Sequence, residues 1–262
     1  MAETPGSNIT KALPPRIRNA TQYAFFFDLD GTLAPIVERP EQASVPASTR
    51  HLLAELQRQS GGAVAIISGR AAKQIDIMTH PLRLPLSGLH GAQWRGANGQ
   101  LHEVELPEGQ ISALYQQLAE IANRHPGTMV EHKGLSVALH YRTAPQHADS
   151  VNTMATQLAT RFGNVFELQT GKMVVEFKPP GVDKGQALQR FMGEPIFCGR
   201  TPVMAGDDTT DESAFEVANR HGGITIRIGP GSTSARYRLS SPEALAQWMA
   251  SLLGDKRKGG AS

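Results

Sequence analysis

The feature that most constrains the fold of this chain is an apolar run that ends abruptly in acidic residues. Residues Ala24–Phe27 read Ala-Phe-Phe-Phe and lead directly into Asp28-Leu29-Asp30-Gly31-Thr32. A continuous apolar run, as opposed to an alternating one, is typical of a strand that is buried on both faces of its sheet. Such strands belong to parallel sheets covered by helices on both sides, so this run predicts an α/β fold.

A helix and a second strand of the same kind follow. Residues 48–59 carry leucines at helical spacing, and Ser48 is the expected N-cap. Residues 63–67 are a second apolar run, which ends at Ser68. Strand, helix and strand together form the βαβ unit of a parallel sheet.

The middle of the chain differs from its two ends in the pattern of its apolar and polar residues. It holds short alternating segments and two helical ones, the pattern of an antiparallel sheet with two helices on one face. We therefore expect a Rossmann-like α/β core, residues 1–92 and 181–262, interrupted by an inserted α+β domain at residues 93–180. The helices expected along the whole chain span residues 48–59, 110–124, 148–161, 184–192, 211–219 and 242–253.

Composition and charge fit an ordinary globular protein. The chain has 262 residues, of which 40% are hydrophobic and 19% are charged, enough for one large domain or a domain with an insertion. The formal net charge is only +2, and the one cluster of basic residues lies in the tail, at residues 256–258. We therefore expect no nucleic-acid partner, and we expect a monomer that acts on a small molecule.

Cysteine usage and hydropathy limit the cellular setting. The single cysteine, Cys198, excludes an intramolecular disulfide and a multi-cysteine metal site, and we expect it to be a small core residue. The first residues lack the charged start and apolar run of a secretory signal. No segment approaches the ~20 apolar residues that span a bilayer. The expected location is the cytoplasm, away from membranes.

Acidic residues follow two of the expected strands. Asp28 and Asp30 come directly after the first strand, and Asp207 and Asp208 come after a later one. Ligands of open parallel sheets bind beyond the carboxyl ends of the strands, so these side chains should meet in one crevice. The alternative for the first pair is a turn, because Asp-Gly is a common turn sequence. The alternative for the second group is helix capping, which Asp211 can also perform.

The acidic groups predict a divalent cation. Adjacent carboxylates such as Asp207 and Asp208 repel each other, and a hard cation relieves that repulsion. Magnesium prefers oxygen ligands and is usually held by one or two carboxylates plus a substrate phosphate, whereas no cluster of His and Cys indicates zinc. Ser68 and Lys184 are candidate phosphate ligands. Taken alone, Ser68 in Ser-Gly-Arg is more often part of a turn, and Lys184 is more often a solvent-facing lysine.

Taken in chain order, these residues resemble the four motifs of the haloacid dehalogenase (HAD) phosphatase superfamily, and the resemblance spans nearly the whole chain. The motifs are Asp28-Leu29-Asp30-Gly31-Thr32, Ser68, Lys184 and Gly206-Asp207-Asp208. Five segments narrow the resemblance to the trehalose-6-phosphate phosphatases, in their stand-alone bacterial form. These segments are Ile67–Arg70, Gly88–Gly91, Glu131–Gly134, Gly171–Glu176 and Gly206–Glu212.

The resemblance implies a two-step mechanism. Asp28 attacks phosphorus and becomes an aspartyl phosphate. Asp30 protonates the leaving sugar oxygen and then activates the water that hydrolyses this intermediate. Ser68 and Lys184 hold phosphate oxygens. A carboxylate nucleophile divides one difficult displacement into two easier steps, which suits an ester as unreactive as a phosphate monoester.

The resemblance also implies where the cation and the sugar bind. Mg²⁺ is bound by Asp28, by the backbone carbonyl of Asp30 and by Asp207, and Asp208 and Asp211 support these ligands. The inserted domain acts as a cap that closes over the sugar. The residues expected to contact the sugar are Arg70, His90 and Gly91 on the core, and Glu131, Lys133, Arg142 and Glu176 on the cap. Without the resemblance, the charged cap residues read as solvent-facing pairs.

The implied activity is magnesium-dependent hydrolysis of trehalose 6-phosphate to trehalose and phosphate. One alternative is the same chemistry on another sugar or glycosyl phosphate, such as a sucrose, mannosyl-glycerate or nucleotide phosphate. A phosphomutase and a catalytically silent sugar-phosphate-binding regulator are weaker alternatives. The regulator is disfavoured because Asp28, Asp30, Lys184 and Asp207 are all present.

Overall fold

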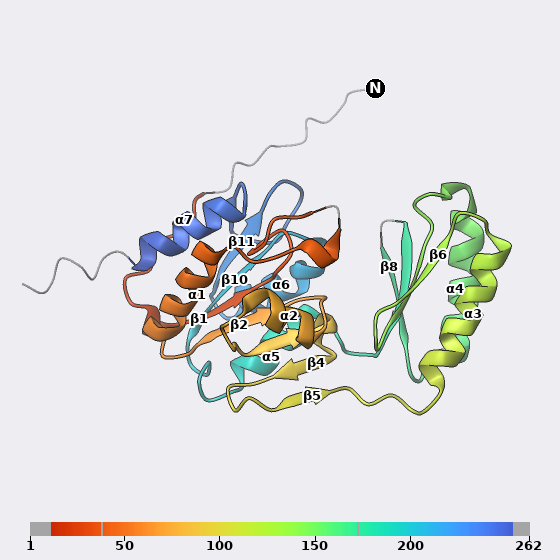
Figure 1. Ribbon diagram of the computed structural model, residues 1–262, viewed down its shortest axis with the longest axis horizontal. Coiled ribbons are helices and arrows are strands. Elements are labelled where there is room, and N and C mark those ends of the chain that lie inside the picture. The colour runs from red at the N-terminus through yellow and green to blue at the C-terminus, as the bar shows by residue number, and fades with distance from the viewer. Residues whose placement is uncertain (1–11, 38, 172, 254–262) are drawn as a thin grey trace, which may run out of the picture.

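The computed structural model describes residues 12–37, 39–171 and 173–253, and these form two lobes (Figure 1). The core lobe is built on an eight-stranded sheet, and the cap lobe is built on a four-stranded sheet. The chain begins in the core lobe, crosses to the cap lobe and returns. The expected α/β core with an inserted α+β unit is therefore confirmed.

The core sheet is parallel over most of its width. Its strand order is β12-β11-β10-β1-β2-β3-β4-β5, and neighbours run parallel from β12 to β3, whereas β4 and β5 pair antiparallel. The strands are β1 (Tyr23–Phe27), β2 (Val64–Ile67), β3 (Leu86–Gly88), β4 (Gln93–Arg95), β5 (Leu101–Glu103), β10 (Thr201–Gly206), β11 (Ile224–Ile228) and β12 (Tyr237–Leu239). The order reverses between β1 and β10, because the chain builds outward from β1 on one side and from β10 on the other. Such a switch point is where open α/β sheets bind ligands.

The apolar run of β1 separates two hydrophobic layers. Phe25 and Phe27 pack into the layer beneath α1, α2 and α7, whereas Ala24 and Phe26 pack into the layer beneath α5 and α6. All four side chains are fully buried, and burying one phenylalanine contributes about 3 kcal/mol. The run is continuous because helices cover both faces of the strand. The core helices are α1 (Ala47–Gln59), α2 (Ala72–Thr79), α5 (Lys184–Met192), α6 (Glu212–Arg220) and α7 (Pro242–Leu253).

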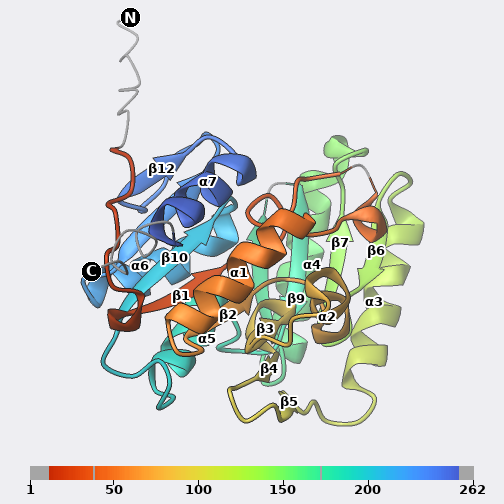
Figure 2. The ribbon, with the colours of Figure 1, turned by 60° about the vertical axis from the view of Figure 1, so that its left-hand side comes forward.

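The cap sheet has helices on one face only. Its antiparallel strands are β6 (Met129–His132), β7 (Val137–His140), β9 (Val174–Lys178) and β8 (Glu167–Gly171), in that spatial order. Helices α3 (Gln110–Arg124) and α4 (Ala148–Phe162) cover the face turned away from the core lobe (Figures 1 and 2). The other face, called here the open face, is turned toward the carboxyl ends of the core strands. The short 3₁₀ helices of the chain are η1 (Ala20–Gln22), η2 (Pro40–Gln42), η3 (Leu89–Gly91), η4 (Pro145–His147) and η5 (Thr209–Asp211).

Three local expectations differ from the structure. Helix α1 begins one residue earlier than expected, after Pro46, so Ser48 lies inside the first turn and does not cap it. Helix α2 was not expected at all. Cys198 is exposed instead of buried, because the neighbouring Phe197 occupies the core position.

The pairing of β4 and β5 bears on where the cap begins. Both strands belong to the core sheet, although the expected boundary at residue 92 precedes them. The other expected boundary, at residue 180, falls in the segment between β9 and α5. We propose residues 104–109 and 179–183 as the two connections between the lobes.

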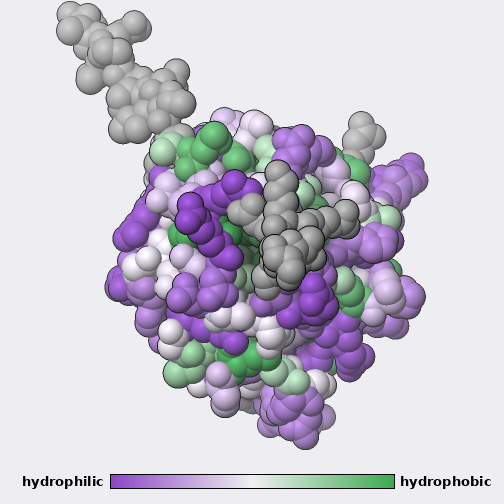
Figure 3. Space-filling view, turned by 90° about the vertical axis from the view of Figure 1, so that its left-hand side faces the viewer, coloured by the Kyte–Doolittle hydropathy of each residue, from purple (hydrophilic) through white to green (hydrophobic). Residues whose placement is uncertain are grey.

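The end of the core lobe far from the cap is mainly hydrophilic. Figure 3 shows this face, on which the visible apolar residues form small separate groups among polar ones. Within the described ranges, no helix is both long enough and apolar enough to cross a bilayer. The basic cluster at residues 256–258 lies outside the described part of the chain.

Candidate active site

The site begins where β1 and β10 end side by side. The backbone N–H of Asp28 donates to the carbonyl of Ala205 at 2.9 Å, so the pairing of the two strands continues to the last residue of β1 and beyond it. Asp28 is buried, and Asp207 comes directly after β10. The two acidic motifs, which are far apart in the sequence, therefore meet at the switch point of the sheet.

Three carboxylates converge there. One oxygen each from Asp28, Asp207 and Asp211 can be chosen so that all lie within 4.8 Å of one another. The cluster requires glycine at position 31, where φ is +75° and a Cβ atom would lie 2.1 Å from the carboxylate of Asp207. Gly31 thus explains on physical grounds why the first motif reads Asp-x-Asp-Gly.

One lysine neutralises part of this charge. Lys184 is the first residue of α5, and the side chain of Asp183 caps that helix by accepting from the backbone N–H of Gln186 at 2.9 Å. The Lys184 Nζ atom lies 2.9 Å from Oδ1 of Asp28 and 2.7 Å from Oδ1 of Asp211. Its side chain is only 3% exposed, so the ammonium is held rigidly between two carboxylates.

The charge of the cluster remains unbalanced. Burial raises the pKa of Asp28 well above its usual range; the attraction of Lys184 opposes this rise, and the neighbouring carboxylates add to it. Burial and then Asp211 raise the pKa of Asp207. Burial opposes the charged form of Lys184, but the two carboxylates it contacts raise its pKa above the ordinary value. Three acidic groups against one cation leave a net negative pocket.

The donor set fits a hard divalent cation. All three converging groups are carboxylates, the oxygen ligands that such cations prefer. Oδ1 of Asp28 is buried and accepts no hydrogen bond of good geometry from the described residues, although the Lys184 ammonium lies nearby. A cation bound here would supply the missing positive charge.

Asp208 lies outside the three-carboxylate cluster. Its side chain caps η5 by accepting from the backbone N–H of Thr209 at 2.7 Å, and its own N–H donates to Oδ2 of Asp211 at 2.9 Å. This is the capping geometry that the sequence left open as an alternative. Asp208 thereby fixes the position of Asp211.

Asp30 is held away from the cluster by an arginine. Arg70 donates from Nε and Nη2 to the two carboxylate oxygens of Asp30, at 2.6 and 2.7 Å. This two-point contact, chiefly its hydrogen bonds, raises the pKa of the guanidinium. The Asp30 side chain is 39% exposed, so its carboxylate borders the crevice between the lobes. Such a position suits proton exchange with a bound ligand.

Ser68, His90 and Gly91 gather on the neighbouring strand ends. Ser68 follows β2, is buried, and accepts from the Arg70 N–H at 3.2 Å. The backbone N–H of His90 donates to the Ser68 carbonyl at 3.1 Å. The imidazole lies so close to Gly69 that a Cβ atom there would be 2.6 Å from Nε2. Gly91 completes the turn in a left-handed conformation, with φ at +120°.

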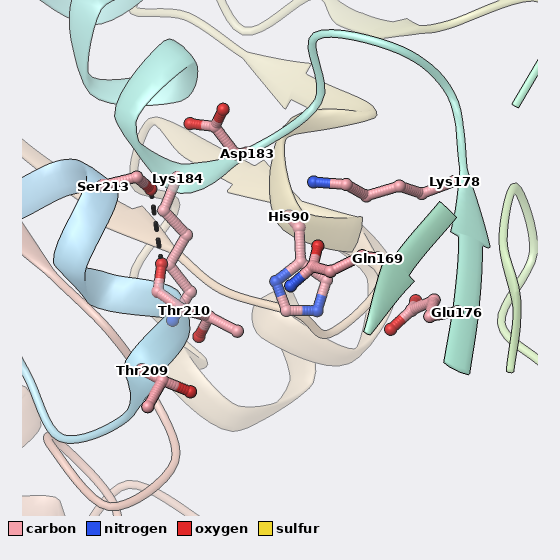
Figure 4. A pocket seen from close by; sticks show the side chains of 9 residues that line it. All are labelled: His90, Gln169, Glu176, Lys178, Asp183, Lys184, Thr209, Thr210 and Ser213. Carbon is pink, nitrogen blue, oxygen red and sulfur yellow. Dashed lines mark hydrogen bonds between the residues drawn. The ribbon is translucent and has the colours of Figure 1, made fainter. Parts of the chain in front are cut away.

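A cavity of about 180 Å³ lies between the lobes (Figure 4). Residues of both lobes line it: helices and loops at the strand ends on the core side, and strands β8 and β9 on the cap side. The core lobe contributes His90, Asp183, Lys184, Thr209, Thr210 and Ser213, and the cap lobe contributes Gln169, Glu176 and Lys178. A ligand in this cavity would therefore touch both lobes at once.

The open face of the cap carries a connected set of charges. Glu176 accepts from the Ser136 hydroxyl at 2.7 Å, and Lys133 Nζ lies 3.5 Å from Glu176 and 3.8 Å from Glu131. Burial opposes ionisation of Glu176, but Lys133 and Ser136 prevail and lower its pKa. Glu176 is thus a fixed anion in the cavity wall. Arg142 is exposed and is not among the residues that line this cavity.

Sequence reasoning missed several lining residues. The pairing of Gln169 with Glu176 could have indicated the first of them, because residues directly opposite on antiparallel strands share a face. Lys178 could have been indicated too, because it lies two residues after Glu176 on β9 and so shares its face. The remaining ones carry no pattern that sets them apart from ordinary loop and helix residues; they are Asp183, Thr209, Thr210 and Ser213.

The partly buried position of His90 predicts a dependence of stability on pH. Burial, followed by the charge of Lys184, lowers the pKa of His90 to about 4 from 6.5. Between these values the unfolded chain binds a proton that the folded chain does not, so stability falls as pH falls. The free energy of unfolding, measured with urea, should fall less between pH 7 and pH 4 in His90→Gln than in the unmodified chain, by at most about 3 kcal/mol. If it falls equally in both proteins, the His90 imidazole is exposed to solvent and its pKa is not lowered.

Two named relatives align with this chain over nearly its full length. It is 44% identical over 241 residues to the trehalose-6-phosphate phosphatase of Escherichia coli (strain K12), covering 92% of this chain and 90% of the relative. It is 36% identical over 249 residues to a probable trehalose-phosphate phosphatase of Sinorhizobium fredii (strain NBRC 101917 / NGR234), covering 94% and 92% of the two chains.

Solved structures share its fold. A trehalose-6-phosphate phosphatase related protein superposes with a TM-score of 0.68 at 29% identity, over 88% of this chain and 96% of the other. A haloacid dehalogenase-like hydrolase from Bacteroides thetaiotaomicron superposes with a TM-score of 0.62 at 14% identity, over 87% and 98% of the two chains. At that identity the likeness shows the fold alone, and the fold is HAD-like as expected.

A family model settles the relationship. The model for trehalose-phosphatase matches residues 26–243, a span that includes both acidic motifs, Lys184 and the whole cap. The resemblance stated from the motifs is thereby confirmed. This chain belongs to the trehalose-phosphatase family.

Proposed function

We propose that this chain hydrolyses trehalose 6-phosphate to trehalose and phosphate through an aspartyl-phosphate intermediate on Asp28. The observation that carries the proposal is the position of Asp28 at the switch point, 2.9 Å from Lys184 and next to two further carboxylates. Relatives that match the chain over nearly its whole length carry this activity in their names.

Asp28 is the nucleophile. Its carboxylate attacks phosphorus, the bond from phosphorus to the sugar oxygen breaks, and an acyl phosphate forms. Phosphate monoesters carry negative charge, which repels an anionic nucleophile unless cations lie between them. Lys184 meets this need because its ammonium contacts Asp28 directly. We assign Ser68, on the adjacent strand end, to another phosphate oxygen.

Asp30 acts as the general acid and then as the general base. It donates a proton to the leaving sugar oxygen and then accepts one from the water that attacks the acyl phosphate. Arg70 positions this carboxylate through its two short hydrogen bonds. The arginine must release or share Asp30 when substrate binds, so we place Arg70 among the residues that contact the substrate.

Magnesium is the proposed cation. Asp28, Asp207 and the backbone carbonyl of Asp30 would hold it, supported by Asp208 and Asp211. When bound, Mg²⁺ supplies positive charge that stabilises the phosphoryl oxygens in the transition state. Asp211 contacts Lys184 at 2.7 Å, and Asp208 fixes Asp211, so these two residues set the shape of the pocket.

The cap recognises the sugar. A sugar hydroxyl both donates and accepts hydrogen bonds, and the open face offers carboxylates as acceptors and ammonium groups as donors. Closure of the cap would exclude bulk water from the reacting groups. The proposed sugar contacts are His90, Gly91, Arg70, Glu131, Lys133, Glu176 and Arg142, the last reaching the sugar only after closure.

Composition supports the setting proposed for this enzyme. The low net charge of +2 provides no basis for nucleic-acid binding. We propose a monomer in the cytoplasm that needs no partner other than its substrate and its cation.

A substrate panel with and without magnesium tests the proposal. Phosphate release should be far faster from trehalose 6-phosphate than from sucrose 6-phosphate, a nucleotide or p-nitrophenyl phosphate. EDTA should stop all of it, and added Mg²⁺ should restore it. Equal rates across the panel would show a general HAD phosphatase without preference for trehalose 6-phosphate. Phosphate moved to another position of the sugar, instead of being released, would indicate a mutase. Activity that survives EDTA would show that the mechanism needs no cation.

A further inference from the structure

We propose that Gln169 binds the sugar ring that carries the phosphate and thereby sets the preference of the enzyme for sugar phosphates. This inference rests on the proposed function, since it assigns a new residue to that same reaction. Gln169 lies on β8, one of the two edge strands of the cap sheet. Figure 4 shows its amide extending into the cavity beside His90.

Gln169 is exposed, and it differs from the other cap residues in the cavity by having no side-chain partner in the described part of the chain. Glu176 is bound by Ser136 and Lys133, and the Lys178 ammonium is bound by the Val182 carbonyl and lies 3.2 Å from Glu167. Among the described residues, no hydrogen bond or ion pair involves the Gln169 amide. Its two N–H donors and its carbonyl are available to a ligand.

The strand register fixes where a ligand would meet this amide. Glu131, Ala138, Glu176 and Gln169 lie directly opposite one another across the four strands. They form one row on the open face, with Glu131 and Gln169 at its two ends. Strands are spaced about 4.8 Å apart, so the row is about 14 Å long. This length exceeds one pyranose ring, and a two-ring ligand can contact both ends.

The phosphate lies at the Gln169 end of the row. Lys184, which contacts the nucleophile Asp28 at 2.9 Å, lines the same cavity as Gln169, whereas Glu131 does not line it. A phosphoryl group beside Lys184 and Asp28 places its own ring next to Gln169. The second ring then extends toward Glu131.

An uncharged amide suits this position. Phosphate arrives as a dianion, and Glu176 and Asp183 already place negative charge in the cavity wall. A further carboxylate on β8 would repel the phosphate, whereas an amide binds ring hydroxyls as both donor and acceptor. The plain alternative is that Gln169 only keeps an exposed edge strand in contact with water.

Steady-state kinetics of Gln169→Ala separates these possibilities. We expect kcat/KM for trehalose 6-phosphate to fall about tenfold, the effect of losing one or two hydrogen bonds. The inhibition constant of glucose 6-phosphate against p-nitrophenyl phosphate turnover should weaken to a similar extent. Turnover of p-nitrophenyl phosphate, which has no sugar, should not change and serves as the reference for correct folding. Gln169→Glu should lower kcat/KM for trehalose 6-phosphate further.

Two control variants sharpen the test. Thr170→Ala changes the next residue of β8, which pairs with Val175 and so belongs to the opposite face; all three measurements should stay as in the unmodified enzyme. Glu131→Ala should lower kcat/KM for trehalose 6-phosphate but leave the inhibition constant of glucose 6-phosphate unchanged.

The outcomes distinguish this inference from the proposed function. If the unmodified enzyme does not prefer trehalose 6-phosphate, the proposed function itself fails. If it does prefer that substrate, the assignment of Gln169 is wrong when Gln169→Ala changes kcat/KM less than twofold, or when p-nitrophenyl phosphate turnover falls by the same factor.

Discussion

Asp28→Asn is expected to abolish phosphate release while the protein stays folded. The variant keeps the shape of the side chain but lacks the anionic oxygen that would form the bond to phosphorus. Loss of a nucleophile in enzymes that work through a covalent intermediate lowers kcat by factors on the order of 10⁴ to 10⁶. Phosphate release from trehalose 6-phosphate in the presence of Mg²⁺ measures this loss.

The same variant should not lose stability when no metal is present. Burial makes the charged form of Asp28 unfavourable, and Asp211 and Asp207 add repulsion. Asparagine removes this charge, and Lys184 keeps its contact with Asp211. The free energy of unfolding, measured with urea in EDTA at pH 7, should therefore be unchanged or higher. The opposite result would mean that the attraction between Asp28 and Lys184 outweighs the cost of burial.

Asp149→Asn is the matched control. It makes the same chemical change at an exposed position in the first turn of α4, and α4 lies on the cap face remote from the cavity. Its kcat should equal that of the unmodified enzyme. Turnover by Asp28→Asn at the same rate as this control would refute Asp28 as the nucleophile.

The core of this site could be predicted because a buried strand produces a clear pattern of apolar residues in the sequence. A strand covered on both faces must be continuously apolar, so the carboxylates that end it, Asp28 and Asp30, stand out. The parallel order of the strands then requires the ends of β1 and β10 to meet, which places Asp207 beside Asp28. Helices α3, α5 and α7 have the expected bounds for a related reason, since one continuous face of each is buried.

Other features could not be predicted because they depend on contacts between distant segments. Strands β4 and β5 are only three residues long, and local pattern cannot tell which sheet a short strand joins. Asp208 has the same residue type as Asp207 and Asp211, which belong to the carboxylate cluster, yet its geometry is that of a cap. Arg70 and Asp30 are 40 positions apart in the chain, and no repeating pattern in the sequence indicates that they pair.

The cap combines features that the sequence indicated with features that it could not indicate. The family resemblance implied that Glu131 and Glu176 both contact the sugar, and the strand register places these two glutamates on one face of the cap sheet. Whether that face meets solvent or the core lobe depends on which side the helices cover. Only the structure supplies this information, and only with it does Gln169 become a candidate for binding.

Lys184→Met should destabilise the protein more than any other single change considered for this site. The variant leaves Asp28 and Asp211 buried and close together without the ammonium that lies 2.9 and 2.7 Å from them. Removing one partner of a buried ion pair typically costs 3–5 kcal/mol, because the remaining charge is left unpaired. Urea unfolding in EDTA should show a loss of about this size, and phosphate release should fall below detection.

Two further variants separate lost charge from lost packing. Lys178→Met makes the same substitution at another buried lysine. Its acidic partner among the described residues, Glu167, is 44% exposed, so the loss of stability should be clearly smaller. Adding Asp211→Asn to Lys184→Met removes one of the two stranded carboxylates and should restore part of the stability. If the double variant is no more stable than Lys184→Met, the lysine acts through its packing and not through its charge.

Magnesium should partly replace the lysine in this experiment. A ligand that binds only the folded state raises its stability in proportion to the logarithm of its concentration. With Lys184 gone, the pocket is more negative, so the cation should bind more tightly and raise the stability of Lys184→Met by more than that of the unmodified protein. This gain requires no turnover, so it tests the cation pocket apart from the chemistry. An equal gain in both proteins would mean that the cation and Lys184 do not neutralise the same carboxylates, and the arrangement proposed for the phosphoryl site would have to be abandoned.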